Sequence, residues 1–119
     1  MRRFLVAGGF LMAGVFAGLA FGGVTFSRAQ VVATEYSFAL SRSHLKAGRA
    51  EIELANFGQD QHDLRLQRVG SRHIAGIGIV DPGARADLNL KLAPGRYLVW
   101  CSVANHRALG MRATLVVSR

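Results

Sequence analysis

The sequence is short of cysteine, because Cys101 is the only one among its 119 residues. No disulfide can therefore form within the chain, although an oxidising compartment normally pairs its cysteines. A lone buried thiol is often no more than a small hydrophobic side chain. The alternative is that a metal ion holds the sulfur, and the residues that follow Cys101 bear on that choice.

The sequence also lacks the features of a nucleic-acid-binding protein. Lysine and arginine outnumber aspartate and glutamate by 15 to 7, which gives a net charge of +8. The basic residues are scattered, however, and there is no basic helix, nucleic-acid motif or row of aromatic residues for stacking bases. We therefore expect no nucleic acid among the partners, and the charge favours an acidic partner or surface.

The chain opens with a long uncharged run. After Arg2 and Arg3, residues 4–26 carry no charge and are rich in Gly, Ala, Phe and Leu. Small residues at 27 and 29 favour cleavage by a signal peptidase before Gln30, whereas the run is also long enough to span a bilayer. The sequence thus predicts residues 1–29 as a signal peptide or as a retained N-terminal anchor helix. Residues 30–119 are predicted as one exported domain, either free in the periplasm or another extracytoplasmic space, or anchored to the outer face of the cytoplasmic membrane.

Helical periodicity is nearly absent from residues 30–119, which argues against a helical domain. Polar and apolar residues alternate instead, as expected for half-buried antiparallel strands, at 51–54, 63–66 and 87–92. Further strands are indicated by segments rich in β-branched and aromatic residues, at 31–40, 74–80, 97–103 and 114–118. We expect an all-β domain, a small antiparallel β-sandwich of about seven or eight strands.

Two residues follow Cys101 at regular intervals, in a segment predicted to be a loop between two strands. His106 and Met111 complete a C-x4-H-x4-M pattern, and Met111 is the only methionine after residue 29. A thiolate, an imidazole and a thioether together select copper over harder metals, whereas zinc would usually take a nitrogen, oxygen or sulfur ligand other than methionine. Such a copper site needs a second histidine, for which there are three candidates: His44, His62 and His73.

The segment around His62 and the segment around Cys101 together carry a family pattern. Residues 56–63 read N-x-G-x3-H-D, and residues 94–111 read P-G-x-Y-x3-C-S-x3-H-x3-G-M. In these motifs the chain resembles the blue copper proteins, or cupredoxins, most of all the small plastocyanin-like and rusticyanin-like members. The resemblance covers nearly all of residues 30–119 and implies a Greek-key β-sandwich that holds one type 1 copper ion. Ala104-Asn105 departs from the Pro-Gly that many members carry before the second histidine.

The resemblance also implies a role for individual residues. His62, Cys101 and His106 would form a trigonal plane around the copper, with Met111 as a long axial ligand. Asp63 and Ser102 occupy positions at which the family braces the two ligand segments against each other. The family presents the histidine of the C-terminal loop to solvent within an apolar patch, so a redox partner, acidic in character, is expected to dock transiently near His106.

We expect from this that the protein is a one-electron carrier and not an enzyme. Copper oxidases carry further copper centres marked by H-x-H pairs, which this sequence lacks, and a cysteine hydrolase would leave Met111 unexplained. The alternative is a periplasmic module that delivers or stores copper. Surface clusters of Met and His would favour that alternative, and a single methionine after residue 29 counts against it.

Overall fold

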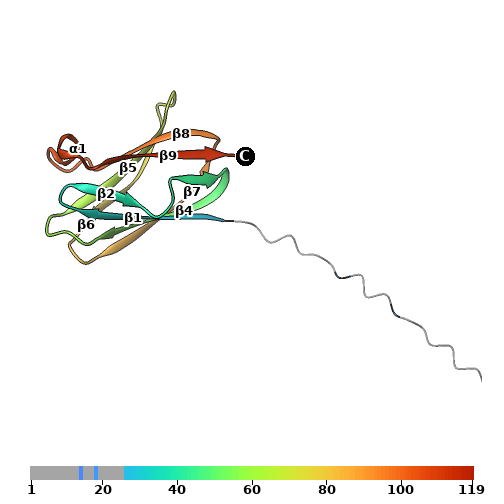
Figure 1. Cartoon of the computed structure of the whole chain (residues 1–119), viewed down its shortest axis with the longest axis horizontal. Helices are drawn as coiled ribbons and strands as arrows, with labels where there is room; N and C mark the ends of the chain where they lie inside the picture. Colours follow the sequence, from blue (N-terminus) through green and yellow to red (C-terminus); the bar gives the residue numbers. More distant parts are fainter. Residues whose placement is uncertain (1–13, 15–17, 19–25) are drawn as a thin grey trace, which may run out of the picture.

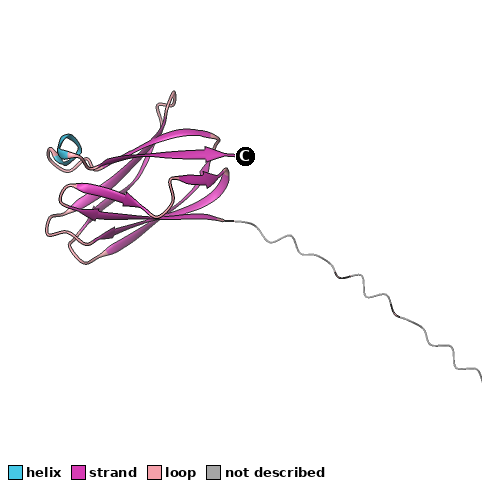
Figure 2. Ribbon diagram, viewed as in Figure 1, coloured by secondary structure: helices cyan, strands magenta, loops and turns pink. Residues whose placement is uncertain are grey.

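The computed structural model describes residues 14, 18 and 26–119, and the strands and turns lie in the last of these ranges. Almost all regular structure is β, in agreement with the predicted fold class (Figure 2). The predicted N-terminal helix falls outside the described residues. The elements are β1 (Ser27–Thr34), β2 (Ser37–Leu40), β3 (His44–Lys46), β4 (Gly48–Asn56), β5 (His62–Arg68), β6 (Ile74–Val80), β7 (Arg85–Leu92), β8 (Gly95–Trp100), α1 (His106–Leu109) and β9 (Arg112–Ser118).

The strands form two sheets that pack face to face as a sandwich (Figure 1). One sheet has the order β2-β1-β4-β7 and the other has the order β3-β9-β8-β5-β6. The predicted antiparallel pairing holds for five of the strand pairs, whereas β1 pairs with β4 and β3 pairs with β9 in parallel. Alternation within a strand reports which face is buried but not the direction of its neighbour, so the sequence pattern could not reveal these two pairs.

The core lies between the sheets and follows from the period-two patterns. In β4, for example, Ala50, Ile52 and Leu54 are buried, whereas Glu51 and Glu53 are half-buried on the other face. Burying one such aliphatic side chain stabilises the fold by roughly 1.5–3 kcal/mol. Every buried hydrophobic residue in the described part of the chain lies between positions 29 and 117. Residues 26–119 therefore contain a complete core of their own.

The first strand begins three residues before the predicted domain boundary at Gln30. Ser27 and Ala29 pair with Ala50 and Ile52 of β4, and Ala29 is buried. The Ser27 hydroxyl also donates to the carbonyl oxygen of Lys46 at 3.0 Å. Cleavage before Gln30 would thus remove the start of β1. Among the described residues, none belongs to a helix with the length and apolar character needed to cross a bilayer.

The sandwich has two ends of different character. The segments 35–36, 57–61, 81–84 and 101–111 connect strands at one end, which we call the ligand end. The start of β1, the segments 69–73 and 93–94 and the C-terminus lie at the opposite, basal end (Figure 1). Three of the predicted metal ligands lie on the segment 101–111, and His62 begins β5 directly after the segment 57–61.

Candidate metal centre

A braced loop delivers His62 to the interior. β4 ends at Asn56, whose side chain is 1% exposed, and β5 begins at His62. The Asn56 amide donates to the carbonyl oxygens of Asp60 at 2.8 Å and Val80 at 2.9 Å, and its oxygen accepts from the N–H of Gly58 at 2.9 Å. Because both ends of the amide are bonded, the intervening loop has a fixed course. His62 is fully buried at the end of that loop.

The other three predicted ligands lie on the loop between β8 and β9. The N–H of Cys101 donates to the carbonyl oxygen of Met111 at 3.0 Å, and the N–H of Met111 donates to that of His106 at 3.1 Å. The backbone thus closes the loop on itself. The four-residue helix α1, which the sequence did not reveal, begins at His106, and this side chain is buried. A loop of this kind fixes the three ligands relative to one another.

Three ligand atoms form a compact triangle beneath the loop. The Nδ1 atoms of His62 and His106 are 3.2 Å apart, and the Cys101 Sγ lies 4.0 Å from the first and 3.8 Å from the second. A point at the centre of this triangle is about 2.1 Å from each atom, which falls within the usual metal–nitrogen and metal–thiolate bond lengths of roughly 2.0–2.3 Å. The three residues therefore have the spacing of trigonal ligands to one ion.

Met111 and the three triangle residues are shielded from water. Cys101, His62 and Met111 are 0% exposed, and His106 is 6% exposed. Met111 also belongs to the same buried core cluster as Cys101. One thiolate, two imidazoles and a neighbouring thioether suit copper in either oxidation state, so the donor set fits the ion that the sequence predicts.

The thiol of Cys101 is protonated in the metal-free protein at neutral pH. Burial of the sulfur raises the pKa of Cys101 above its usual value of 9.0. The thiolate is the form that binds a metal, so an ion that enters the site displaces this proton. A free thiol with a raised pKa is a poor nucleophile, which argues against cysteine-based hydrolysis at this site.

Asp63 and Ser102 connect the two ligand segments. The carboxylate of Asp63, which is 3% exposed, accepts hydrogen bonds from the backbone N–H of Ser102 at 2.6 Å and from its hydroxyl. Arg65 lies 3.6 Å from the same carboxylate. Asp63 follows His62 directly and Ser102 follows Cys101 directly, so these bonds hold the two ligands at a constant separation.

Glu35, in the turn between β1 and β2, is a site residue that the sequence analysis missed. Its Oε1 accepts from the backbone N–H groups of Gln59 and Asp60, each at 2.7 Å, and lies 3.2 Å from His62 Nε2. A Cβ on Gly58 would collide with this carboxylate, which explains the glycine in the motif. A proton on Nε2, donated to Glu35, leaves Nδ1 with the lone pair that a metal needs.

The same contacts make Glu35 acidic, which leads to a prediction for acid stability. The N–H of Asp60 is the main cause that lowers the pKa of Glu35 from 4.5 to about 2. A carboxyl whose pKa is lower in the folded state stabilises the fold above the unfolded value and loses this contribution as the pH falls through the folded value. We expect metal-free Glu35→Gln to lose less stability than the wild type between about pH 5 and about pH 2.

Urea titrations at several pH values would measure this difference. Asp87→Asn, which removes an exposed carboxylate without an ion-pair partner in the described chain, controls for the loss of one acidic residue. If the wild type and Glu35→Gln lost the same amount of stability over this pH range, the hydrogen bonds of Glu35 would not be the cause of its acid sensitivity.

His106 is covered more than the sequence resemblance implies. The ring of Tyr36 packs on it with centroids 4.9 Å apart, and Asp60 Oδ2 lies 3.8 Å from His106 Nε2. The Tyr36 hydroxyl donates to the same carboxylate at 3.3 Å, and this negative charge raises the pKa of Tyr36. Tyr36 itself is 39% exposed and Leu109 is 50% exposed. Tyr36 therefore forms part of the accessible surface over His106, which is itself only 6% exposed.

The two other histidines do not take part in the cluster. His44 in β3 and His73 before β6 are both exposed, and the group of potential metal ligands found in the described residues contains neither. Of the aromatic residues on β8, Tyr97 packs in the core and Trp100 is buried under the guanidinium of Arg107, which lies 4.5 Å from the ring centroid.

Solved structures with the same fold include a blue copper protein and a multicopper oxidase, whereas no protein-family model and no curated protein sequence matches the chain. An auracyanin from Roseiflexus castenholzii has a TM-score of 0.64 at 17% identity, covering 82% of this chain and all of the auracyanin. Auracyanin A, a blue copper protein of Chloroflexus aurantiacus, has a TM-score of 0.63 at 18% identity, covering 78% and 99%. Reduced rusticyanin has a TM-score of 0.60 at 21% identity, covering 76% and 79%.

The fold is thus the cupredoxin fold that the sequence motifs predicted. The fold also occurs in a larger enzyme, because a multicopper oxidase matches with a TM-score of 0.58 at 18% identity, and this chain covers 42% of that chain. At such identities the likeness concerns the fold, and the activity has to be argued from the site itself.

Proposed function

We propose that the protein is an extracytoplasmic type 1 copper protein that carries single electrons, with copper held by His62, Cys101, His106 and Met111. The observation that carries this proposal is the triangle of two Nδ1 atoms and one Sγ, whose centre is at bonding distance from all three. Bound copper would supply a one-electron Cu(I)/Cu(II) couple.

The residues around the triangle suit rapid electron transfer. The segments that carry the ligands are held by hydrogen bonds that the Asn56 amide donates and that the carboxylates of Asp63 and Glu35 accept. Ligands that need not move when copper changes its oxidation state keep the reorganisation energy of electron transfer small. The buried, water-excluding environment of Cys101 and the weak thioether of Met111 favour the reduced ion and raise the potential.

A partner would approach over Tyr36, which packs on His106, and over Leu109, which is exposed in the same short helix as His106. Together these two side chains would offer a small apolar patch. A small patch of this kind suits a brief encounter better than a stable complex. Arg107, within the ligand loop, and Arg112, directly after it, are exposed, so they would favour an acidic partner through their charge.

Two other functions find less support. A delivery or storage module would expose sulfur or imidazole ligands to exchange copper, whereas Met111 is fully buried and both ligand histidines are nearly so. A copper oxidase would need further copper centres, and one cluster of potential ligands is found in the described part of the chain. Neither alternative accounts for a single enclosed site.

The test is a visible and electron paramagnetic resonance spectrum of residues 26–119 with one equivalent of Cu(II). We expect an intense thiolate-to-copper band and a narrow copper hyperfine splitting, both of which disappear in Cys101→Ser. The matched control is His73→Ala, which removes an exposed imidazole and should leave the spectrum unchanged. A pale spectrum with a wide splitting, or no binding, would refute the type 1 assignment.

A second measurement separates a carrier from a delivery module. The loaded protein would be reduced and reoxidised in the presence of a copper chelator. An electron carrier should retain its copper through repeated cycles, because the same ligands suit both oxidation states. Release of copper on reduction would favour delivery instead.

A further inference from the structure

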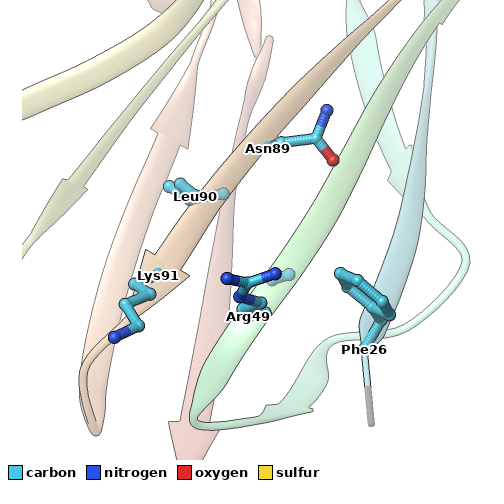
Figure 3. Close-up of a pocket in the computed structure, with 6 residues that line it drawn as sticks. Phe26, Arg49, Asn89, Leu90 and Lys91 are labelled. Atoms are coloured by element: carbon cyan, nitrogen blue, oxygen red, sulfur yellow. The ribbon is translucent and has the colours of Figure 1, made fainter. Parts of the chain in front are cut away.

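The basal end of the sandwich carries a group of basic residues around one exposed aromatic ring. Phe26, which precedes β1 directly, is 52% exposed. It lines a hollow of about 450 Å³ together with Arg49 and Lys91 (Figure 3). A second hollow of about 410 Å³ is lined by Phe26 with Arg42 and Lys46. We call these residues the basic collar: Phe26, Arg42, Lys46, Arg49 and Lys91.

The charges of the collar are not balanced within the domain. In residues 26–119, the ion pairs with carboxylates include none of the four basic collar residues. Arg49 and Lys91 lie directly opposite each other on β4 and β7. Like charges at opposed positions of two strands destabilise a sheet, so a negative group that lies against this pair would relieve its repulsion.

The acidic residues lie elsewhere in the fold. Four of them are on segments or strand starts of the ligand end, and the other three lie nearer to that end than the collar residues of β4 and β7 do: Glu35, Asp60, Asp63, Asp81, Glu51, Glu53 and Asp87. The domain therefore has a positive basal end and a ligand end that holds acidic side chains. Such a distribution orients a protein on a negatively charged surface.

The position of the collar along the chain indicates what kind of negatively charged surface the basal end would face. Phe26 is the last residue of the uncharged run 4–26, and β1 begins at the next residue, so no linker separates the run from the collar. Aromatic side chains favour the boundary between hydrocarbon and water, and basic side chains beside them attract anionic headgroups. Both kinds of side chain surround the point at which this apolar run joins the domain.

We propose that the basic collar binds the anionic headgroups of a phospholipid bilayer and holds the basal end of the sandwich against it. Phe26 lies at the level of the headgroups, and the phosphates compensate the opposed charges of Arg49 and Lys91. The proposal does not depend on copper or on electron transfer, so its test and that of the proposed function succeed or fail separately.

The test uses residues 26–119, whose core is complete, and measures binding to vesicles by co-sedimentation. Vesicles of phosphatidylcholine with phosphatidylglycerol are compared with vesicles of phosphatidylcholine alone. We expect binding to the anionic vesicles only. Raising the salt from about 0.1 M to about 1 M, which shortens the Debye length from about 10 Å to about 3 Å, should abolish it.

Paired variants locate the contact. Arg49→Gln with Lys91→Gln should lower the vesicle affinity roughly 30-fold, since each basic residue near an anionic surface contributes about fivefold. The charge-matched control, Arg107→Gln with Arg112→Gln at the ligand end, should change it less than about twofold. Equal losses in the two variants would overturn the proposal, because they would indicate attraction by net charge alone.

Thermal unfolding of the same double variant shows whether a loss of vesicle binding comes from a folding defect. Because Arg49 and Lys91 repel each other, their double replacement should raise the thermal midpoint at low salt slightly while it weakens vesicle binding. If the double variant lost both vesicle binding and thermal stability, the result would contradict a direct contact between these two residues and the headgroups. Equal binding to neutral vesicles would overturn the proposal as well.

Discussion

Replacing Glu35 with alanine is expected to weaken copper binding by roughly 10- to 100-fold, as removal of a group that orients a metal-binding histidine typically does. Glu35 Oε1 lies 3.2 Å from His62 Nε2 and accepts from two N–H groups of the preceding loop. Without it, the ring of His62 is free to carry its proton on either nitrogen, and the loop loses its acceptor. Competition with a chelator of known affinity would measure the change.

Glu35→Gln separates the charge of this residue from its position. The amide oxygen can still accept from the N–H groups of Gln59 and Asp60, so the loop should keep its course. A negative charge near the ligands stabilises Cu(II) over Cu(I), and its removal should raise the reduction potential by several tens of millivolts after solvent screening. The type 1 spectrum should persist. A potential that stays constant in Glu35→Gln, with copper fully bound, would show that Glu35 has only a structural role.

The second large effect is expected at Asp63. Asp63→Ala removes a buried carboxylate that accepts two hydrogen bonds from Ser102. Hydrogen bonds to charged groups are each worth about 1.5–3 kcal/mol, and Ser102 is partly solvated, so we expect a loss of about 3 kcal/mol in the free energy of unfolding. Urea denaturation of the metal-free protein would measure this loss.

The same variant should also disturb the metal site. With the link between the segments of His62 and Cys101 removed, the copper hyperfine splitting should become wider and more heterogeneous. Asp63→Asn keeps one acceptor and should lose less stability than Asp63→Ala. Thr114→Ala, on a strand away from the site, serves as the matched surface control. A stable Asp63→Ala protein with an unaltered spectrum would refute the bracing role.

The sequence predicted local features of the fold better than long-range ones. Alternation located β4, β5 and β7, because each strand buries one face against the other sheet. It merged β1 and β2 into one strand, since apolar residues continue on both sides of the turn at 35–36. It missed α1, because four residues are too few for helical periodicity. The parallel pairs depend on which distant strands become neighbours, and no local pattern contains that information.

In the candidate metal site, too, the sequence predicted residues that are close along the chain better than contacts between distant segments. Cys101, His106 and Met111 share one loop, so their spacing alone revealed their chemistry. His62 was separated from two other histidines only by a family motif, and the structure places it in the same cluster. Glu35 lies 27 residues before His62, in a turn without a recognisable signal, and its contact exists only once β1 and β4 have paired. The covering of His106 by Tyr36 arises in the same turn.

The separation of the two ends of the sandwich also determines how far a partner has to reach. β4 runs from the basal end at Gly48 to the ligand end at Asn56, and nine residues at about 3.3 Å each cover about 30 Å. With the collar on a bilayer, the metal centre stands at that height above the headgroups. An electron donor or acceptor embedded in the same membrane must project a domain of similar height, whereas a freely diffusing partner meets the centre at the exposed top of the domain.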